Sequence, residues 1–232
     1  FSWQGSVALQ HELRQGLGVS VAYFRTWYGN FNLTDNQGLT AADYDSFCIT
    51  APVDSRLPAS VSGSQICGLY DIKVGRFGRV DNLVARASHY GEQTEVYSGV
   101  DVNVNERFGR GGVLSGGLSM GRTVTDNCFA NDNASLLAPG SATAATVANT
   151  PRVDAFCHIA PPWSAGTQIK FLVVYPLPWS FQTSATYQNL PGIPITASYV
   201  ATNAQILPGL GRPLSAGANA TKTIELIPAN TL

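Results

Sequence analysis

Four cysteines carry the most informative chemistry in this 232-residue sequence. Cys48 and Cys67 form one local pair and Cys128 and Cys157 form another, each within one polar stretch rich in Pro, Gly and Ser. Neither pair has the CxxC spacing of a zinc site, and no histidine cluster accompanies them. We therefore predict two loop-closing disulfides, Cys48–Cys67 and Cys128–Cys157, in an oxidising compartment. The alternative is four free, buried thiols in a cytosolic protein.

Catalytic chemistry has little support in the sequence. The three histidines, His11, His89 and His158, are scattered along the chain. A nucleophile pair of Cys157 and His158 is conceivable, but a neighbour in sequence is rarely oriented as a base, and a disulfide accounts better for Cys157. We therefore expect no catalytic site and predict that the chain is not an enzyme.

Acidic residues in one polar stretch offer a second kind of chemistry. Asp43, Asp45 and Asp71 carry oxygen ligands of the type that calcium prefers. Solvated loop acids are the favoured interpretation, because such residues are common in polar loops. The sequence thus predicts no metal site and no cofactor.

Composition excludes several function classes. Charged residues make up 12% of the chain, about half the usual share for a soluble domain, while hydrophobic residues make up 44%. The net charge of −1 gives no electrostatic basis for binding nucleic acid or an anionic membrane surface. No apolar run reaches the length of a transmembrane helix, but a barrel strand needs only about 10 alternating residues. The first residues read like the inside of a strand and show no signal peptide, so we expect a fragment of a longer protein.

Alternation of apolar and polar residues is the dominant pattern and predicts strands. It is clearest over residues 96–105, where Val96, Val100, Val102 and Val104 share one face. Tyr97, Asp101, Asn103 and Asn105 share the other. Similar patterns predict strands at about 3–10, 17–28, 90–108, 113–125, 167–175, 180–188 and 223–227.

Connections between these strands alternate between short turns and long loops. The long loops fall at about 30–87, 126–164 and 189–222, and the second contains the low-complexity run 139–146. Membrane barrels separate their connections in this way, with short periplasmic turns and long extracellular loops. Trp and Tyr residues gather near strand ends, as at a membrane–water boundary. We therefore predict a single all-β domain over residues 1–232, with antiparallel up-and-down strands that form part of a transmembrane β-barrel.

Three segments suggest a family. Residues 99–112, residues 161–179 and residues 188–195 resemble barrel hairpins and a late loop of large TonB-dependent receptors. The likeness is greatest to the carboxypeptidase-regulatory-like subgroup of soil bacteria such as acidobacteria. This resemblance implies about seven strands from the C-terminal barrel region and a role in energy-coupled nutrient uptake. The plug, the TonB-interacting segment and the terminal aromatic residue of that family are not found in the sequence.

The expected partners are the lipid bilayer and the remaining barrel strands, at the bacterial outer membrane or cell surface; the ligand is not specified. One alternative is a structural β-rich protein that assembles into a homo-oligomer, filament or surface layer by strand addition. Another is a secreted, extracellular β-rich binding module or hydrolase. Dependence on detergent distinguishes the first hypothesis from both alternatives.

Overall fold

A computed structural model of the chain describes residues 1–137 and 149–228. The predicted low-complexity run 139–146 lies outside these residues, as do the last residues of the sequence. The described part is mainly antiparallel β-sheet with few helices, which confirms the predicted all-β class.

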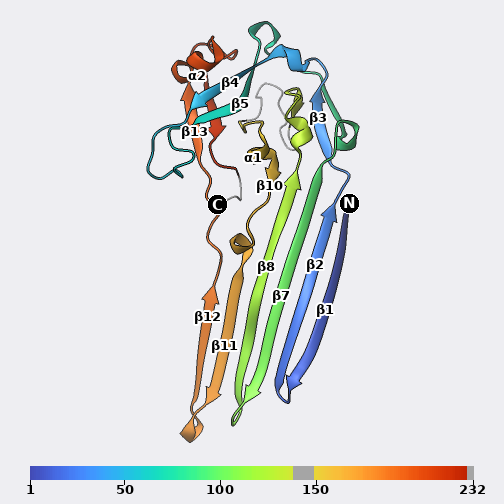
Figure 1. Ribbon diagram of the computed structural model, residues 1–232, viewed down its shortest axis with the longest axis vertical. Helices are drawn as coiled ribbons and strands as arrows, with labels where there is room; N and C mark the ends of the chain where they lie inside the picture. The colour runs from blue at the N-terminus through green and yellow to red at the C-terminus, as the bar shows by residue number, and fades with distance from the viewer. Residues whose placement is uncertain (138–148, 229–232) are drawn as a thin grey trace.

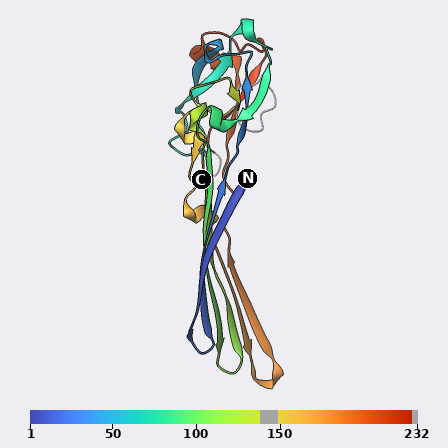
Figure 2. The same cartoon turned by 90° about the vertical axis from the view of Figure 1, so that its right-hand side faces the viewer.

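A long, twisted sheet forms the lower part of the molecule (Figure 1). Its strand order is β1-β2-β7-β8-β11-β12, every neighbouring pair is antiparallel, and the short β10 pairs with the end of β8. Viewed from the side, the sheet is a single layer (Figure 2). The strands are β1 (Ser2–Arg14), β2 (Leu17–Tyr28), β7 (Thr94–Phe108), β8 (Gly112–Asp126), β10 (His158–Ile159), β11 (Gln168–Pro176) and β12 (Gln182–Asn189).

The sheet does not close on itself within the described residues. β1 and β12 lie at opposite ends of the strand order, and each pairs on one side only. The predicted up-and-down order is therefore present, whereas a closed barrel is not found.

Short turns join the long strands at the end of the sheet that is lowest in Figure 1. Each turn contains residues with positive φ, which the turn types favoured by short β-hairpins use. Gly16 has φ of +83° between β1 and β2, and Gly109 and Gly111 have φ of +58° and +106° between β7 and β8. Trp179 and Ser180 adopt the same region between β11 and β12, at φ of 61° and 62°.

The three predicted long loops fold together at the opposite end of the sheet (Figure 1). We call this assembly the cap: residues 30–93, 127–137, 149–157, 160–166 and 190–228. It contains three small sheets, ordered β6-β3-β9, β4-β5 and β13-β14, and several helical segments. Its elements are β3 (Asn32–Asn36), η1 (Ala41–Asp43), β4 (Tyr44–Thr50), β5 (Gln65–Ile72), η2 (Val74–Arg76), β6 (Asn82–Arg86), η3 (Ala87–His89), η4 (Cys128–Ala130), β9 (Leu136–Leu137), α1 (Asp154–Cys157), η5 (Trp163–Gly166), β13 (Ser198–Thr202), α2 (Asn203–Leu210) and β14 (Thr221–Glu225).

One predicted strand belongs to the cap rather than to the long sheet. Residues 223–227 were expected to continue the up-and-down series. Instead, β14 pairs with β13, in a register that sets Tyr199 opposite Ile224. The reason is packing: Ile224 is fully buried in the largest hydrophobic cluster of the cap, which its place beside β13 allows.

All buried apolar side chains of the described residues lie in the cap. The largest cluster joins the β4–β5 hairpin to α2, β13 and β14, and includes Phe47, Leu69, Ile206 and Ile224. None of the six long strands contributes a residue to it. The longest helix is α2, and no helix in residues 1–137 or 149–228 has both the length and the apolar character needed to cross a membrane.

Candidate functional site

Strand register sorts the side chains of the long sheet onto two faces. Residues that pair across an antiparallel ladder point to the same side of the sheet. Val21 pairs with Val102, Val102 pairs with Leu118, and Leu118 pairs with Ile169. Four apolar side chains from four strands therefore form one row. Because of this register, the apolar residues of each strand lie beside the apolar residues of its neighbours, and one face of the sheet is apolar across several strands.

One face of the sheet is apolar over most of its area. Many of its large side chains are exposed: Leu9 keeps 73% of its surface, Trp3 69% and Tyr187 57%. Isolated exposed apolar residues are ordinary, but a continuous patch of this extent marks an interaction surface. The face comprises Trp3, Val7, Leu9, Leu17, Val19, Val21, Tyr23, Trp27, Val96, Val100, Val102, Val104, Leu114, Leu118, Met120, Val124, Ile169, Phe171, Val173, Tyr175, Ala185 and Tyr187.

The opposite face carries mostly small and polar side chains, although Phe24, Val113, Leu172 and Val174 also lie on it. Ser119 Oγ donates to Asp101 Oδ1 at 2.6 Å, and Ser115 Oγ donates to Asn105 Oδ1 at 2.7 Å, so neighbouring strands are cross-linked along it. A shallow groove of about 670 Å³ follows this face near the cap. Its lining includes Gln4, Ser6, Phe24, Thr26, Tyr97, Asp101 and Ser119.

Glycines make room on the polar face for one large ring. A Cβ added at Gly99 or Gly121 would lie 2.9 Å from the Tyr97 ring, which is too close for real atoms. Tyr97 therefore lies flat over two glycines of paired strands, since Gly99 and Gly121 are partners in the ladder. The Tyr97 ring therefore covers the backbone of Gly99 and Gly121, which carry no side chain of their own.

Aromatic residues mark both ends of the apolar face. Trp3 and Trp27 pair at the cap end. Phe108 and Tyr175 stack at the turn end, with ring centroids 5.9 Å apart. About twelve residues of β7 separate the two levels, which is about 40 Å along the strand. A barrel tilt of about 40° would reduce this to about 30 Å, close to the thickness of a bilayer core.

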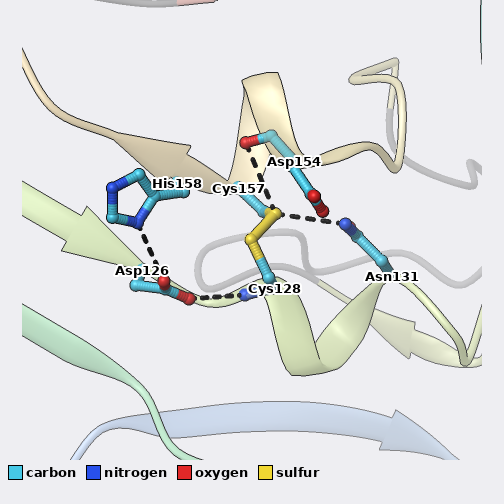
Figure 3. Close-up of a disulfide and its surroundings, with 6 residues drawn as sticks. All are labelled: Asp126, Cys128, Asn131, Asp154, Cys157 and His158. Carbon is cyan, nitrogen blue, oxygen red and sulfur yellow. Dashed lines mark hydrogen bonds and ion pairs between the residues drawn. A yellow bond between two sulfur atoms is a disulfide. The ribbon is translucent and has the colours of Figure 1, made fainter.

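Both disulfides have the predicted pairing. Cys48–Cys67 joins β4 to β5, and Cys128–Cys157 joins η4 to α1. Both lie in the cap, and the described residues include no free cysteine. Asn131 Nδ2 donates to Cys157 Sγ at 3.1 Å beside the second disulfide (Figure 3).

The predicted alternatives for Cys157 are incompatible with this geometry. Its sulfur is bonded to Cys128, so neither a thiolate nucleophile nor a thiolate metal ligand is present. Cys128, Asp154 and Cys157 lie close together, and the two cysteines of this group are joined by the disulfide. Figure 3 shows His158 turned toward Asp126, with Nδ1 2.8 Å from Oδ2, while Asp126 Oδ1 accepts the N–H of Cys128.

The three histidines are not brought together. His11 is near the turn end of β1, His89 is in η3 of the cap and His158 is in β10 beside β8. Nothing in their arrangement assembles a nucleophile with a base.

The three acids Asp43, Asp45 and Asp71 form ion pairs with arginines. Asp43 caps η1 by accepting the Thr40 N–H and pairs with Arg76 Nε at 2.9 Å. Asp45 and Asp71 are partners in the β4–β5 ladder, and both accept hydrogen bonds from the Arg212 guanidinium.

Arg212 is the main polar link between the first and third connections. Its Nη1 lies 2.6 Å from Asp71 Oδ2 and its Nη2 lies 2.8 Å from Asp45 Oδ2. Asp71 also accepts the N–H of Ser215 at 2.9 Å. Burial alone would lower the pKa of Arg212, but the hydrogen bonds with Asp45 and Asp71 outweigh it and raise the pKa.

A second half-buried arginine links the middle connection to its neighbours. Arg152 donates to the carbonyl oxygens of Ala130, Asn133 and Leu136, at 2.5 to 2.9 Å, and its own N–H bonds to Gly68 O of β5. Thr150 Oγ1 donates to Glu225 of β14 at 2.8 Å. The three connections therefore share one hydrogen-bonded network. Sequence reasoning missed both arginines, because nothing local to either residue shows its distant partners.

Comparison with known proteins adds no relative. No family model, no curated protein and no solved structure matches the chain.

Proposed function

We propose that this chain is a wall segment of an outer-membrane β-barrel, of the receptor or transporter type that resembles TonB-dependent receptors. The observation that carries the proposal is the apolar face, which is in register across the long strands and, in the part of the chain that the structure describes, contributes no apolar residue to a buried core. The apolar face of the sheet would be the lipid-facing surface of the barrel, and the opposite face would line its lumen.

The physical argument concerns what covers the apolar face. A single-layer sheet in water must bury one face against another element to be stable. In a bilayer the hydrocarbon covers that face, while the polar face lines a water-filled lumen. β7 and β8 have 15 residues each, and β1 has 13, which exceeds the 9–11 residues that span a membrane at a typical tilt.

The open edges fit the same proposal. Backbone groups on the outer sides of β1 and β12 need partners in a hydrocarbon environment, so further barrel strands would pair with both edges. The polar groove beside Tyr97 and Asp101 would then face the lumen, where a transported nutrient would pass.

The disulfides indicate an oxidising, non-cytoplasmic compartment such as the cell surface or the extracellular space. Both lie at the cap end, on the same side as every long connection. We propose that this side is extracellular and that the short turns are periplasmic. Energy-coupled nutrient uptake is the role of the complete barrel.

A structural role by strand addition is the second candidate. Every residue of β1 is exposed, so a long edge is available for pairing with another copy. This candidate requires the apolar faces of assembled sheets to pack against each other, because no lipid covers them.

The test is refolding from denaturant with and without detergent micelles. We expect β-type circular dichroism and a soluble species only with detergent, and tryptophan quenching by brominated phosphatidylcholine after transfer to vesicles. A folded, soluble monomer without detergent would overturn the proposal and favour a secreted module. Ordered filaments in electron micrographs of detergent-free samples would favour strand addition.

A further inference from the structure

Two arginines interrupt the apolar face near its cap end. Arg25 and Arg122 both pair with Ser98, on opposite sides of β7, so the three residues form one row. The Cα atoms of the two arginines are separated by two strand spacings, about 10 Å. The next row toward the cap contains Trp3, Trp27, Val96 and Val124. The pair thus lies at the aromatic boundary of the apolar face.

Each guanidinium lies against a tryptophan ring. Arg25 Cζ is 5.1 Å from the Trp27 ring centroid, and Arg122 Cζ is 5.1 Å from that of Trp163 in η5. Such stacking uses the flat face of the guanidinium and leaves the N–H groups on its edge available. Arg122 Nη1 donates to Pro161 O at 3.2 Å, and Arg25 Nη1 has only a long contact of 3.5 Å with Tyr23 Oη.

Neither arginine has a carboxylate partner within ion-pair distance among the described residues. The nearest acid on the same face of β8 is Asp126, which is already bonded to His158 and to the N–H of Cys128. Arg25 Nε is buried and has no hydrogen-bond partner.

The opposite end of the apolar face is built differently. There Arg14 and Glu106 flank Leu17 in one row, and they form an ion pair of 2.5 Å. Charge on the turn end of the face is therefore neutralised within the chain, whereas charge on the cap end is not. This difference between the two ends favours binding of an external anion at the cap end only.

An apolar hollow adjoins Arg122. It has a volume of about 460 Å³, and its walls include Pro161, Ala165, Ile193 and Ile195. Ile193 is 91% exposed. A cation beside an apolar wall is complementary to a ligand that carries an anionic group next to a hydrocarbon chain.

We propose that Arg25 and Arg122 bind the phosphate of a lipid head group with a net negative charge at the cap-side rim of the apolar face, with an acyl chain against the neighbouring apolar side chains. Planar guanidinium groups match phosphate oxygens well. The inference rests on the proposed membrane location and adds a lipid preference to it. Because the net charge of the chain is −1, the chain as a whole does not attract an anionic lipid. The attraction between the two arginines and the phosphate acts at contact distance.

The experiment compares two brominated lipids as quenchers of tryptophan fluorescence. The detergent-refolded chain is transferred to phosphatidylcholine vesicles that contain equal amounts of either brominated phosphatidylglycerol or brominated phosphatidylcholine. We expect stronger quenching by the phosphatidylglycerol, since Trp27 and Trp163 stack on the two arginines. The variant Arg25→Gln/Arg122→Gln should lose this preference by about tenfold, the size expected for loss of one charge-assisted hydrogen bond.

Controls separate the possible causes. Arg110→Gln removes an exposed cation from the turn end and should leave the preference unchanged. Arg25→Lys/Arg122→Lys keeps the charge and should retain part of the preference. Inorganic phosphate at the same concentration should not compete; full competition would show an ion site rather than a lipid site and would overturn the proposal.

The outcomes also separate this inference from the proposed function. If brominated phosphatidylcholine quenches the chain and both lipids act equally, the membrane location stands and the lipid site is refuted. If neither lipid quenches the chain, the membrane location itself fails. A preference that survives the double Gln substitution would likewise refute the site.

Discussion

The long sheet and the cap organise their apolar side chains in different ways. The sheet places them on one face of a single layer, where many remain exposed, and its register keeps them in rows. The cap buries them in compact clusters, held by two disulfides and by the arginine links to Asp45 and Asp71. Strand length contributes to the difference, because the short cap strands could not present a face of comparable size.

This contrast shows that the two regions rely on different surroundings. The cap contains its own core and two disulfides, features of small domains that disulfides stabilise. The sheet has no core within the described residues, so its stability depends on what contacts its apolar face and its edges. The following predictions test this division.

Removal of both disulfides should have the largest effect, and it should be confined to the cap. The bridges close loops with sequence separations of 19 and 29 residues, and each contributes about 3 kcal/mol in the chain-entropy model. Replacement of all four cysteines by serine should remove hydrogen-exchange protection from β4, β5 and β14. In the same detergent sample, β7 and β8 should keep their hydrogen-exchange protection. Equal loss in both regions would show that the sheet depends on the cap.

A charge on the apolar face should destabilise the sheet next most strongly. Val102→Arg places a cation in the middle of the apolar rows and should cost about 2–4 kcal/mol in a bilayer, whereas Asn103→Arg on the polar face should be mild. Urea unfolding of vesicle-inserted protein measures both variants. Because the two residues are adjacent on one strand, the position along the strand is matched. Similar losses would indicate a sheet that is buried on both faces.

Asp71→Asn should loosen the junction between the first and third connections by about 2 kcal/mol. The carboxylate is nearly buried and accepts hydrogen bonds from Arg212 and Ser215, so the change leaves a partly buried guanidinium with less compensation. Pulse proteolysis of the cap measures the loss. The matched control is Asp54→Asn, whose partner Arg56 is almost fully exposed, and this variant should show no measurable loss.

The smallest expected effect is a dependence of cap stability on pH through Lys222. Burial lowers the pKa of this ammonium from 10.5 to about 8, although Asp71 acts in the opposite direction. Between these values the unfolded chain binds more protons than the folded chain, so stability should rise with pH, by about 1–2 kcal/mol from pH 8 to pH 10.

Urea denaturation at several pH values, read by pulse proteolysis, would measure this rise. The variant Lys222→Met cannot titrate and should show a flat profile over the same range. A fall in stability between pH 8 and pH 10 for the unmodified chain would contradict the assigned burial of Lys222.

Much of the long sheet could be predicted from local pattern. Alternation located its strands to within a few residues, since a strand face repeats every two residues whatever its partner. The cap was harder, because its strands are short and pair across connections, as β9 does with β3. α2 could have been found from Thr202 and Gln205, which form a capping box, and from Gly211, which ends the helix.

The positions of the long strands and the alternation of their side chains follow from the sequence, because each depends on neighbouring residues. The pairing of the cysteines follows from two local pairs, with separations of 19 and 29 residues. The pairing of β2 with β7, across the long first connection, does not depend on neighbouring residues. The alignment of rows into one continuous apolar face depends on register, where a slip of one residue would exchange the two faces. The cap depends on contacts such as that of Arg212 with Asp45, which are 167 residues apart. Only the folded structure could bring those partners together, because no local pattern identifies them.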